Sequence, residues 1–263
     1  MIHLRSIDIK PAARSLETFP FTLPLVRQFA PVEFSAPVTF FAGENGSGKS
    51  TLLEAIAAAT RLPAAGSAAV DRDDSLEAAR ALGAQLRCAW AAQVHRGFFM
   101  RAEDFLGFTR HTQKLMKELE AEAARHQGDS YGARLARGSI LGQRAALANT
   151  YGENPDAHSH GESFLALFRA RFVPRGVYLL DEPEMPLSPL RQLAFLSLLK
   201  QYVEHEAGQF IIATHSPILL AYPGAAIYSF DGHPLKQVAY DDLESVSLTR
   251  AFLRNPTDYL HRL

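Results

Sequence analysis

One short stretch constrains the fold of this chain more than any other feature: Gly43-Glu44-Asn45-Gly46-Ser47-Gly48-Lys49-Ser50. It has the pattern G-x-x-x-x-G-K-[ST], which joins the end of a buried strand to the start of a helix. An apolar run at residues 38–41 precedes the stretch, and apolar residues at helical spacing follow it over residues 50–60. The sequence therefore predicts an α/β core in which strand, loop and helix follow one another.

The residue types in this loop suit the binding of phosphate groups. Glycine tolerates positive φ and lets successive backbone N–H groups converge on an anion, and the following helix adds the positive end of its dipole. Lys49 would contact the β- and γ-phosphates of a nucleoside triphosphate such as ATP, and the Ser50 hydroxyl would hold Mg²⁺. The expected nucleotide-binding residues are Gly43, Asn45, Gly46, Ser47, Gly48, Lys49, Ser50 and Thr51.

A chance match in an ordinary turn is the alternative interpretation of the loop. With average residue usage, its four fixed positions match in roughly one chain in a hundred of this length. The apolar strand pattern before the loop and the helical pattern after it favour the phosphate-binding interpretation.

Length and composition limit the number of domains and the kinds of partner and cross-link that the chain can have. The 263 residues, 47% of them hydrophobic, suit one large α/β domain over residues 1–263, although length alone also allows two small domains. Because the net charge is −1, nucleic-acid binding would need a local cluster of Lys and Arg. The single cysteine, Cys88, excludes an intrachain disulfide and is expected to be a buried strand residue.

The hydropathy pattern indicates whether the protein is soluble or inserted in a membrane. No apolar run approaches the roughly 20 residues that a membrane helix needs. Residues 1–8 alternate apolar and polar types like a strand and lack the long apolar region of a signal peptide. We therefore expect a soluble, cytoplasmic protein with no direct membrane insertion.

Apolar patterning along the chain alternates between strand and helix, which predicts a mainly parallel sheet covered by helices, with a β-rich N-terminal part. We expect a Pro-punctuated extended stretch at 19–24 and a surface excursion at 61–82. A helical insert is expected over 102–162. Strands are expected at residues 2–9, 38–41, 86–92, 97–101, 177–180 and 210–214, and helices at 50–60, 102–126, 132–149, 163–171 and 189–204.

Two later strand ends carry candidate catalytic groups. Asp181 and Glu182 follow the apolar run 177–180, at the strand end where open α/β sheets bind ligands. Asp181 would hold Mg²⁺, and Glu182 would activate the attacking water. The alternative is that both carboxylates simply cap the helix after Pro183. His215 follows the run 210–214, so it would reach the same edge and bond the γ-phosphate and the water.

The loop at residues 43–50, the pair Asp181 and Glu182, and His215 occur in this order along the chain. In this order they resemble the motifs of the ABC-type ATPases, over about residues 1–240. The resemblance implies a Walker A loop at residues 43–50, a Walker B strand ending at Asp181 and a catalytic glutamate at Glu182. It also implies a D-loop near residues 187–189 and a switch histidine at His215. The implied fold is a mainly parallel core sheet with an N-terminal antiparallel β part and an inserted helical subdomain.

Two family motifs match imperfectly. The signature, usually Leu-Ser-Gly-Gly-Gln, would fall on Ser159-His160-Gly161-Glu162 and contact the γ-phosphate held by the other protomer of a dimer. A plain helix N-cap at Ser159 is the alternative. The glutamine of the Q-loop is replaced by Glu103, which would hold Mg²⁺ or a water, or would start the next helix, where acidic residues are favoured.

Ser216, after the switch histidine, resembles the non-transporter branch, which includes chromosome-maintenance, recombination-repair and phage-defence ATPases. Phe19-Pro20-Phe21 and Gly97-Phe98-Phe99 resemble a group of small stand-alone predicted ATPases. The insert is too short for a long coiled coil, and the stretch after His215 is too short for a nuclease domain.

Three functional hypotheses remain at this stage. The leading one is a stand-alone ATPase that forms a head-to-tail homodimer around two ATP molecules, acting on an unidentified protein partner. The second is the motor subunit of a transporter. The third is a nucleic-acid-associated regulator, for which Arg134, Arg137 and Arg144 would form a basic patch. Phe19 and Phe21 are candidates for adenine contact.

Overall fold

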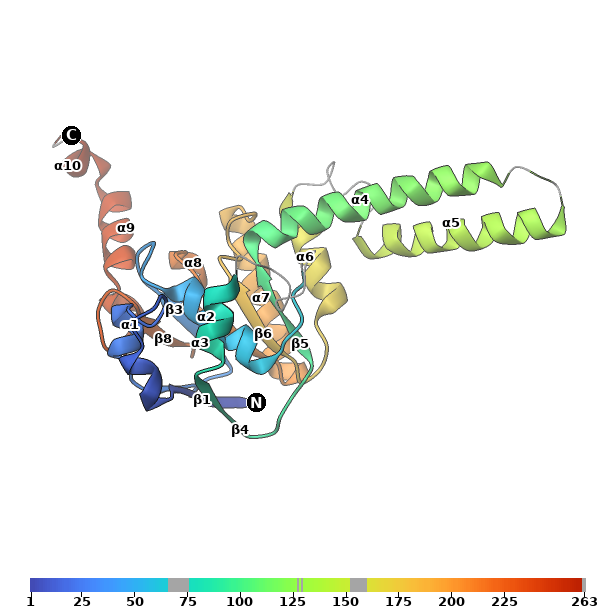
Figure 1. Ribbon diagram of the computed structural model, residues 1–263. Coiled ribbons are helices and arrows are strands. Elements are labelled where there is room, and N and C mark those ends of the chain that lie inside the picture. The colour runs from blue at the N-terminus through green and yellow to red at the C-terminus, as the bar shows by residue number, and fades with distance from the viewer. Residues whose placement is uncertain (66–75, 127, 129, 152–159, 262–263) are drawn as a thin grey trace.

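A six-stranded sheet forms the centre of the protein in a computed structural model that describes residues 1–65, 76–126, 128, 130–151 and 160–261 (Figure 1). The strand order is β5-β6-β7-β3-β8-β9, and every pair is parallel except β8–β9. The strands are β3 Val38–Ala42, β5 Gly97–Arg101, β6 Val177–Asp181, β7 Gln209–Ala213, β8 Ala226–Ser229 and β9 Lys236–Gln237. The mainly parallel core sheet predicted from the sequence is confirmed.

The central strands are apolar along their whole length because both faces of the sheet are covered. Successive side chains point to opposite faces, so Phe41 and Ile211 pack in one core cluster while Phe40 and Ile212 pack in the other. Helices α2 (Lys49–Thr60) and α3 (Glu77–Gly83) cover the first face. Helices α6 (His160–Arg171) and α7 (Pro189–Glu206) cover the second, as the figures show.

A second, antiparallel sheet has the order β2-β1-β4, formed by Val32–Glu33, Leu4–Ile9 and Leu86–Trp90. Gln209 attaches it to the core sheet: its Oε1 accepts from the backbone N–H groups of His3 and Leu4, each at 2.8 Å. Its Nε2 donates to Leu4 O, also at 2.8 Å. The N-terminal antiparallel part expected from the resemblance is therefore present.

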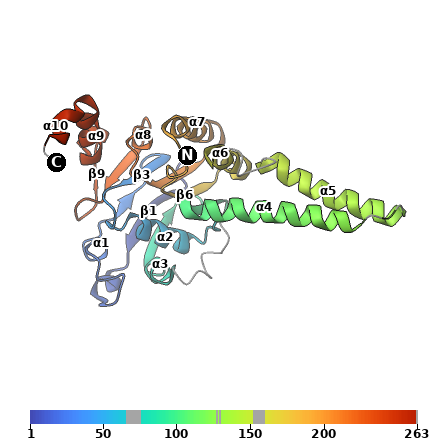
Figure 2. The same ribbon diagram turned by 90° about the horizontal axis from the view of Figure 1, so that it is seen from above.

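Helices α4 (Ala102–Arg125) and α5 (Tyr131–Tyr151) pack side by side and project from the body as a hairpin (Figure 2). Arg144 on α5 donates to Glu120 on α4 at 2.8 Å. Arg144 is thus engaged in this ion pair, whereas Arg134 and Arg137 are exposed. A basic patch of these three arginines stays a prediction.

The remaining short elements flank the sheet. They are the 3₁₀ helices η1 Pro11–Ser15 and η3 Tyr240–Asp242, and the helices α1 Pro24–Arg27, α8 Pro217–Leu220, α9 Glu244–Arg254 and α10 Pro256–Leu260. Helices α9 and α10 leave the body on the side away from the α4–α5 hairpin (Figure 1). Within the described ranges, no helix combines the length and apolar character needed to cross a membrane.

Three local expectations were wrong. Residues 19–24 form turns and the start of α1 rather than an extended stretch, because Pro24 fits the first position of a helix. Within 61–82, residues 66–75 lie outside the described residues, but α3 is a packed helix whose Leu82 is fully buried. Cys88 is only half-buried, since its strand β4 lies at the edge of the small sheet.

Candidate functional site

Three parallel strands bring the predicted site residues to one edge of the core sheet. Asp181 pairs in register with Ala213, and Ala213 pairs with Phe41. The chain leaves these strands as the loop after β3, the turn after Asp181 and the segment beginning at Thr214. Because the carboxyl ends of parallel strands share an edge, side chains far apart in sequence meet there.

The loop after β3 has the conformation that its glycines predict. Gly43, Gly46 and Gly48 have φ of 148°, 78° and 97°, a region that favours glycine. Gly43 also lies against the end of β8, where an added Cβ would be 2.9 Å from the Cβ of Phe230. The helix α2 then begins at Lys49, so its N-terminus lies at the end of the loop. This arrangement is a cradle for an anion.

Lys49 lies inside the loop. Its Nζ donates to the backbone carbonyls of Gly43 and Glu44, each at 2.8 Å, and the residue is 4% exposed. Burial lowers the pKa of Lys49, and the nearby carboxylates of Glu182 and Asp181 oppose this shift. The ammonium group is therefore held where a polyphosphate in the cradle would meet it.

Ser50 and Asp181 form the candidate magnesium position. The Ser50 hydroxyl donates to Asp181 Oδ1 at 3.1 Å. Burial raises the pKa of Asp181 to about 7, against the lowering effect of the Ser50 hydrogen bond, so a cation would favour the ionised carboxylate. No group of three or more His, Cys, Asp or Glu suited to a metal occurs among the described residues. One hydroxyl and one carboxylate fit Mg²⁺, which completes its shell with phosphates and waters.

Glu182 and His215 face each other across the same edge. His215 Nε2 lies 3.6 Å from Glu182 Oε1, and each side chain is about one third exposed. Glu182 has φ of 48°, which is unusual for a residue with a side chain, and its N–H donates to Ala213 O at 2.9 Å. The strained backbone turns the Glu182 side chain out of the strand and toward His215.

Two site residues escaped the sequence analysis. Glu184 Oε1 accepts from Thr214 Oγ1 at 2.6 Å and from the His215 N–H at 2.8 Å. Asp231 Oδ1 accepts from the Glu44 N–H at 2.8 Å and so fixes the phosphate loop to the end of β8. The repeated acid in Asp-Glu-Pro-Glu and the Asp-Gly after an apolar run were the available signals.

A pocket of about 420 Å³ lies over the loop. The pocket is lined by the loop together with Thr214, His215, Asp231, Glu244 and Ser245. None of the described residues lining it comes from α6. Phe21 is buried in the core and Phe19 is 64% exposed, and neither lines this pocket.

The structure says less about the other predicted residues. Thr51 is half-buried in the first turn of α2. Ser159 lies outside the described residues, and His160, Gly161 and Glu162 begin α6, without described side chains. Glu103 is in the first turn of α4, also without a described side chain, and the backbone of Arg101 there is capped by Asp104 instead. The roles of all six stay predictions.

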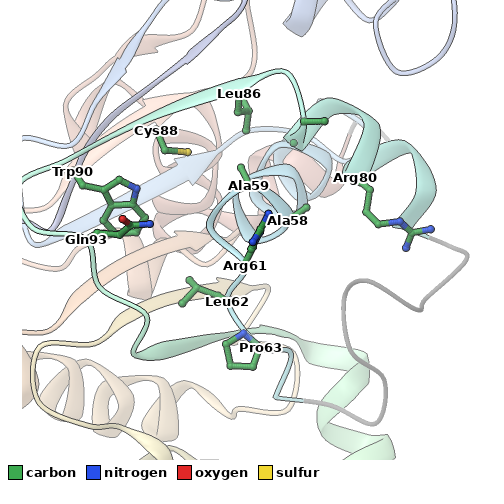
Figure 3. Close-up of a pocket in the computed structure, with 12 residues that line it drawn as sticks. Ala58, Ala59, Arg61, Leu62, Pro63, Arg80, Leu86, Cys88, Trp90 and Gln93 are labelled. Atoms are coloured by element: carbon green, nitrogen blue, oxygen red, sulfur yellow. The ribbon is translucent and has the colours of Figure 1, made fainter.

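A larger pocket, of about 1060 Å³, lies elsewhere, between α2, α3 and β4 (Figure 3). Arg61, which ends α2, lies beside Leu62, while Cys88 and Trp90 come from β4. Burial raises the pKa of Cys88 to about 11, so its thiol is unreactive near neutral pH. This pocket adjoins the end of α2 that is opposite the phosphate loop.

Two segments of the sequence match known protein families. A family described as "AAA domain" matches residues 21–69, which contain the phosphate loop. A family described as "AAA domain, putative AbiEii toxin, Type IV TA system" matches residues 163–221, which contain Asp181, Glu182 and His215. No curated protein matches the sequence. The two matched segments, each less than half of the chain, are similar to AAA domains and contain the phosphate loop and the second carboxylate strand.

Several solved structures are similar to this chain. One, titled "An inward-facing conformation of a putative metal-chelate type ABC transporter", is 16% identical with a TM-score of 0.50 and covers 96% of this chain and 90% of its own. The SMC head domain from Thermotoga maritima is 17% identical with a TM-score of 0.41 and covers 90% and 99%. The Smc head domain from Pyrococcus furiosus is 12% identical with a TM-score of 0.47 and covers 97% and 100%. At 16% identity, the first of these structures shows a fold shared with this chain.

Proposed function

We propose that this protein binds ATP with Mg²⁺ and hydrolyses it to ADP and phosphate. The observation that carries the proposal is the hydrogen bond of 3.1 Å between Ser50 Oγ and Asp181 Oδ1, which joins the loop to the second carboxylate strand. It brings a hydroxyl and a carboxylate, the donors that Mg²⁺ takes beside nucleotide phosphates, next to the Lys49 ammonium. We further propose that residues 1–263 form one ATPase domain with a helical insert at 102–162.

Each residue at the edge has a proposed part in hydrolysis. Lys49 and the loop N–H groups bind the phosphates and balance the charge that develops on them. Ser50 and Asp181 would hold Mg²⁺, which supplies positive charge at the phosphate oxygens. Glu182 accepts the proton of the attacking water. His215 Nε2 has no hydrogen-bond partner among the described residues, and we assign it to the γ-phosphate or the attacking water.

Phosphate release tests hydrolysis directly. Purified protein with ATP should release phosphate when Mg²⁺ is present and stop when it is chelated. Lys49→Ala should abolish ATP binding as well as release, because the buried ammonium that meets the phosphates is gone. A wild-type protein that releases no phosphate at saturating Mg-ATP would contradict the proposal.

We also propose a head-to-tail homodimer in which residues 159–162 of one protomer contact the γ-phosphate bound by the other. A helix N-terminus is a phosphate-binding device, and α6 begins at this segment. The resemblance to ABC-type ATPases implies that this segment contacts the γ-phosphate held by the other protomer, so we place the contact across the dimer. ATP would then hold the dimer together, and hydrolysis would release it.

Size-exclusion chromatography with light scattering tests the dimer. Glu182→Gln should bind ATP without hydrolysing it and elute as a dimer with Mg-ATP. The matched control, Glu182→Gln with Lys49→Ala, should stay monomeric because it binds no ATP. A Glu182→Gln protein that binds ATP and remains monomeric would leave the ATPase proposal standing and remove the dimer.

A further inference from the structure

Glu184 links the two strand ends that carry Glu182 and His215. It lies in the turn that follows β6, three residues after Asp181. Its Oε1 accepts from Thr214 Oγ1 at 2.6 Å and from the backbone N–H of His215 at 2.8 Å. A single carboxyl oxygen therefore fixes both the side chain before His215 and the peptide group of His215 itself.

The bonds continue on the other side of His215. The Ser216 N–H donates to Thr214 Oγ1 at 3.0 Å. The Ser216 hydroxyl donates to Gln192 Oε1 on α7, and it accepts from the N–H groups of Ile218 and Leu219 at 3.1 Å and 3.2 Å. Residues 214 and 216 are thus both held from outside the segment.

The imidazole of His215 has no comparable support. Its Nε2 makes no hydrogen bond within the described part of the chain, and Glu182 Oε1 lies 3.6 Å from it. Because no described hydrogen bond holds Nε2, the position of the His215 backbone helps to decide whether the ring faces Glu182. The Glu184 bond joins the N–H of His215 itself to the turn after β6.

We propose that Glu184 is a positioning residue that holds the His215 backbone so that its imidazole faces Glu182. The placement of the ring stands independently of catalysis, whereas its effect on turnover rests on the proposed ATPase function. A plain structural role, in which Glu184 only stabilises the turn after β6, is the competing account. The two accounts differ in whether loss of Glu184 changes the response of the His215 ring to a substitution at Glu182.

The environment of Glu184 suits a fixed acceptor. Its Oε2 is buried and has no hydrogen-bond partner among the described residues, so Oε1 alone makes the described contacts to the His215 segment. Burial raises the pKa of Glu184, and the bonds from Thr214 and His215 lower it. Glutamine keeps an acceptor oxygen at the same place, so Glu184→Gln should preserve positioning while Glu184→Ala removes it.

The test uses the NMR resonances of the His215 ring in the nucleotide-free protein, assigned by their loss in His215→Ala. In the wild-type background, Glu182→Gln should move these resonances, because the two side chains lie 3.6 Å apart. In the Glu184→Ala background the same substitution should move them little, since the ring no longer faces residue 182. In the Glu184→Gln background the response should return.

Gln209→Ala is the matched control for lost stability. Gln209 lies at the opposite end of β7 and also accepts two buried backbone N–H bonds. The Gln209→Ala variant should have a lower melting temperature, as Glu184→Ala does. The response of the His215 resonances to Glu182→Gln should nevertheless stay intact in it. An unchanged response in Glu184→Ala, or a response lost equally in Gln209→Ala, would overturn the positioning role.

Steady-state kinetics add a second readout. Glu184→Ala should lower kcat by about ten- to a hundredfold with little change in KM for ATP, because misplacement of a group beside the reacting water costs rate rather than binding. Glu184→Gln should recover most of kcat. If the wild-type protein hydrolyses no ATP, the proposed function fails, but the NMR result still decides the positioning of His215.

Discussion

At the scale of single residues, the site depends on charged groups that are partly removed from water. Lys49 is 4% exposed and Asp181 is 8% exposed. Burial lowers the pKa of the lysine and raises that of the acid to about 7. Both shifts disfavour charge, so a bound polyphosphate with its cation would supply the opposite charges that these residues lack.

The first prediction concerns the charge of the Lys49 ammonium. Lys49→Met keeps an apolar stem of similar length but removes the charge, and should weaken Mg-ATP binding by at least about tenfold, as the loss of a charge-assisted contact does. Titration calorimetry measures this. Arg27→Met, at an exposed position on α1, is the control and should bind as the wild type does. Equal affinities of Lys49→Met and wild type would refute the assigned contact.

Cys88 gives a second prediction, on pH dependence. With a pKa of about 11, the thiol ionises further with each step in pH, so its alkylation by iodoacetamide should accelerate about tenfold per pH unit between pH 8 and 10. Because Cys88 is the only cysteine, mass spectrometry reads the rate without ambiguity. In urea the rate should level off near pH 8.5, the ordinary thiol value. The same plateau in the folded protein would disprove the shift.

At the scale of elements, the predictability of each segment follows from the range of its interactions. Strands β3, β6 and β7 are continuous apolar runs bounded by turn residues, so the sequence alone locates them. Helix α3 was missed because its stretch is rich in Ala and carries few large apolar residues. The partners of Glu184 and Asp231 lie 30 and 187 positions away in sequence, and no local pattern shows such contacts.

The contact of α3 with α2 supports a third prediction. A Cβ at Gly83 would lie 2.7 Å from Ala55 O and 3.0 Å from the Cβ of Ala58, so the two helices approach as closely as glycine permits. Gly83→Ala should therefore lower the free energy of unfolding by about 1–3 kcal/mol.

The control is Gly138→Ala on α5, where nothing lies within 4 Å of the added methyl group. There the higher helix propensity of alanine should raise stability, by up to about 1 kcal/mol. Urea denaturation compares both variants with the wild type. The close packing of α3 on α2 would be contradicted if Gly83→Ala were as stable as Gly138→Ala.

At the scale of the whole molecule, one sheet edge collects every group proposed for hydrolysis, while the helices cover the faces. The α4–α5 hairpin and the α9–α10 pair extend away from the sheet in different directions (Figures 1 and 2). The loop–helix unit at residues 43–60 sits between the two sheets of the molecule.

The measurement that tests the central claim most directly is single-turnover hydrolysis of radiolabelled ATP with Mg²⁺, comparing wild type with Glu182→Gln. The account predicts that both bind ATP with similar affinity, and that the variant cleaves it at least about a hundredfold more slowly because the base that activates water is gone. Cleavage by Glu182→Gln at the wild-type rate would contradict the assignment of Glu182, and with it the proposed hydrolytic site.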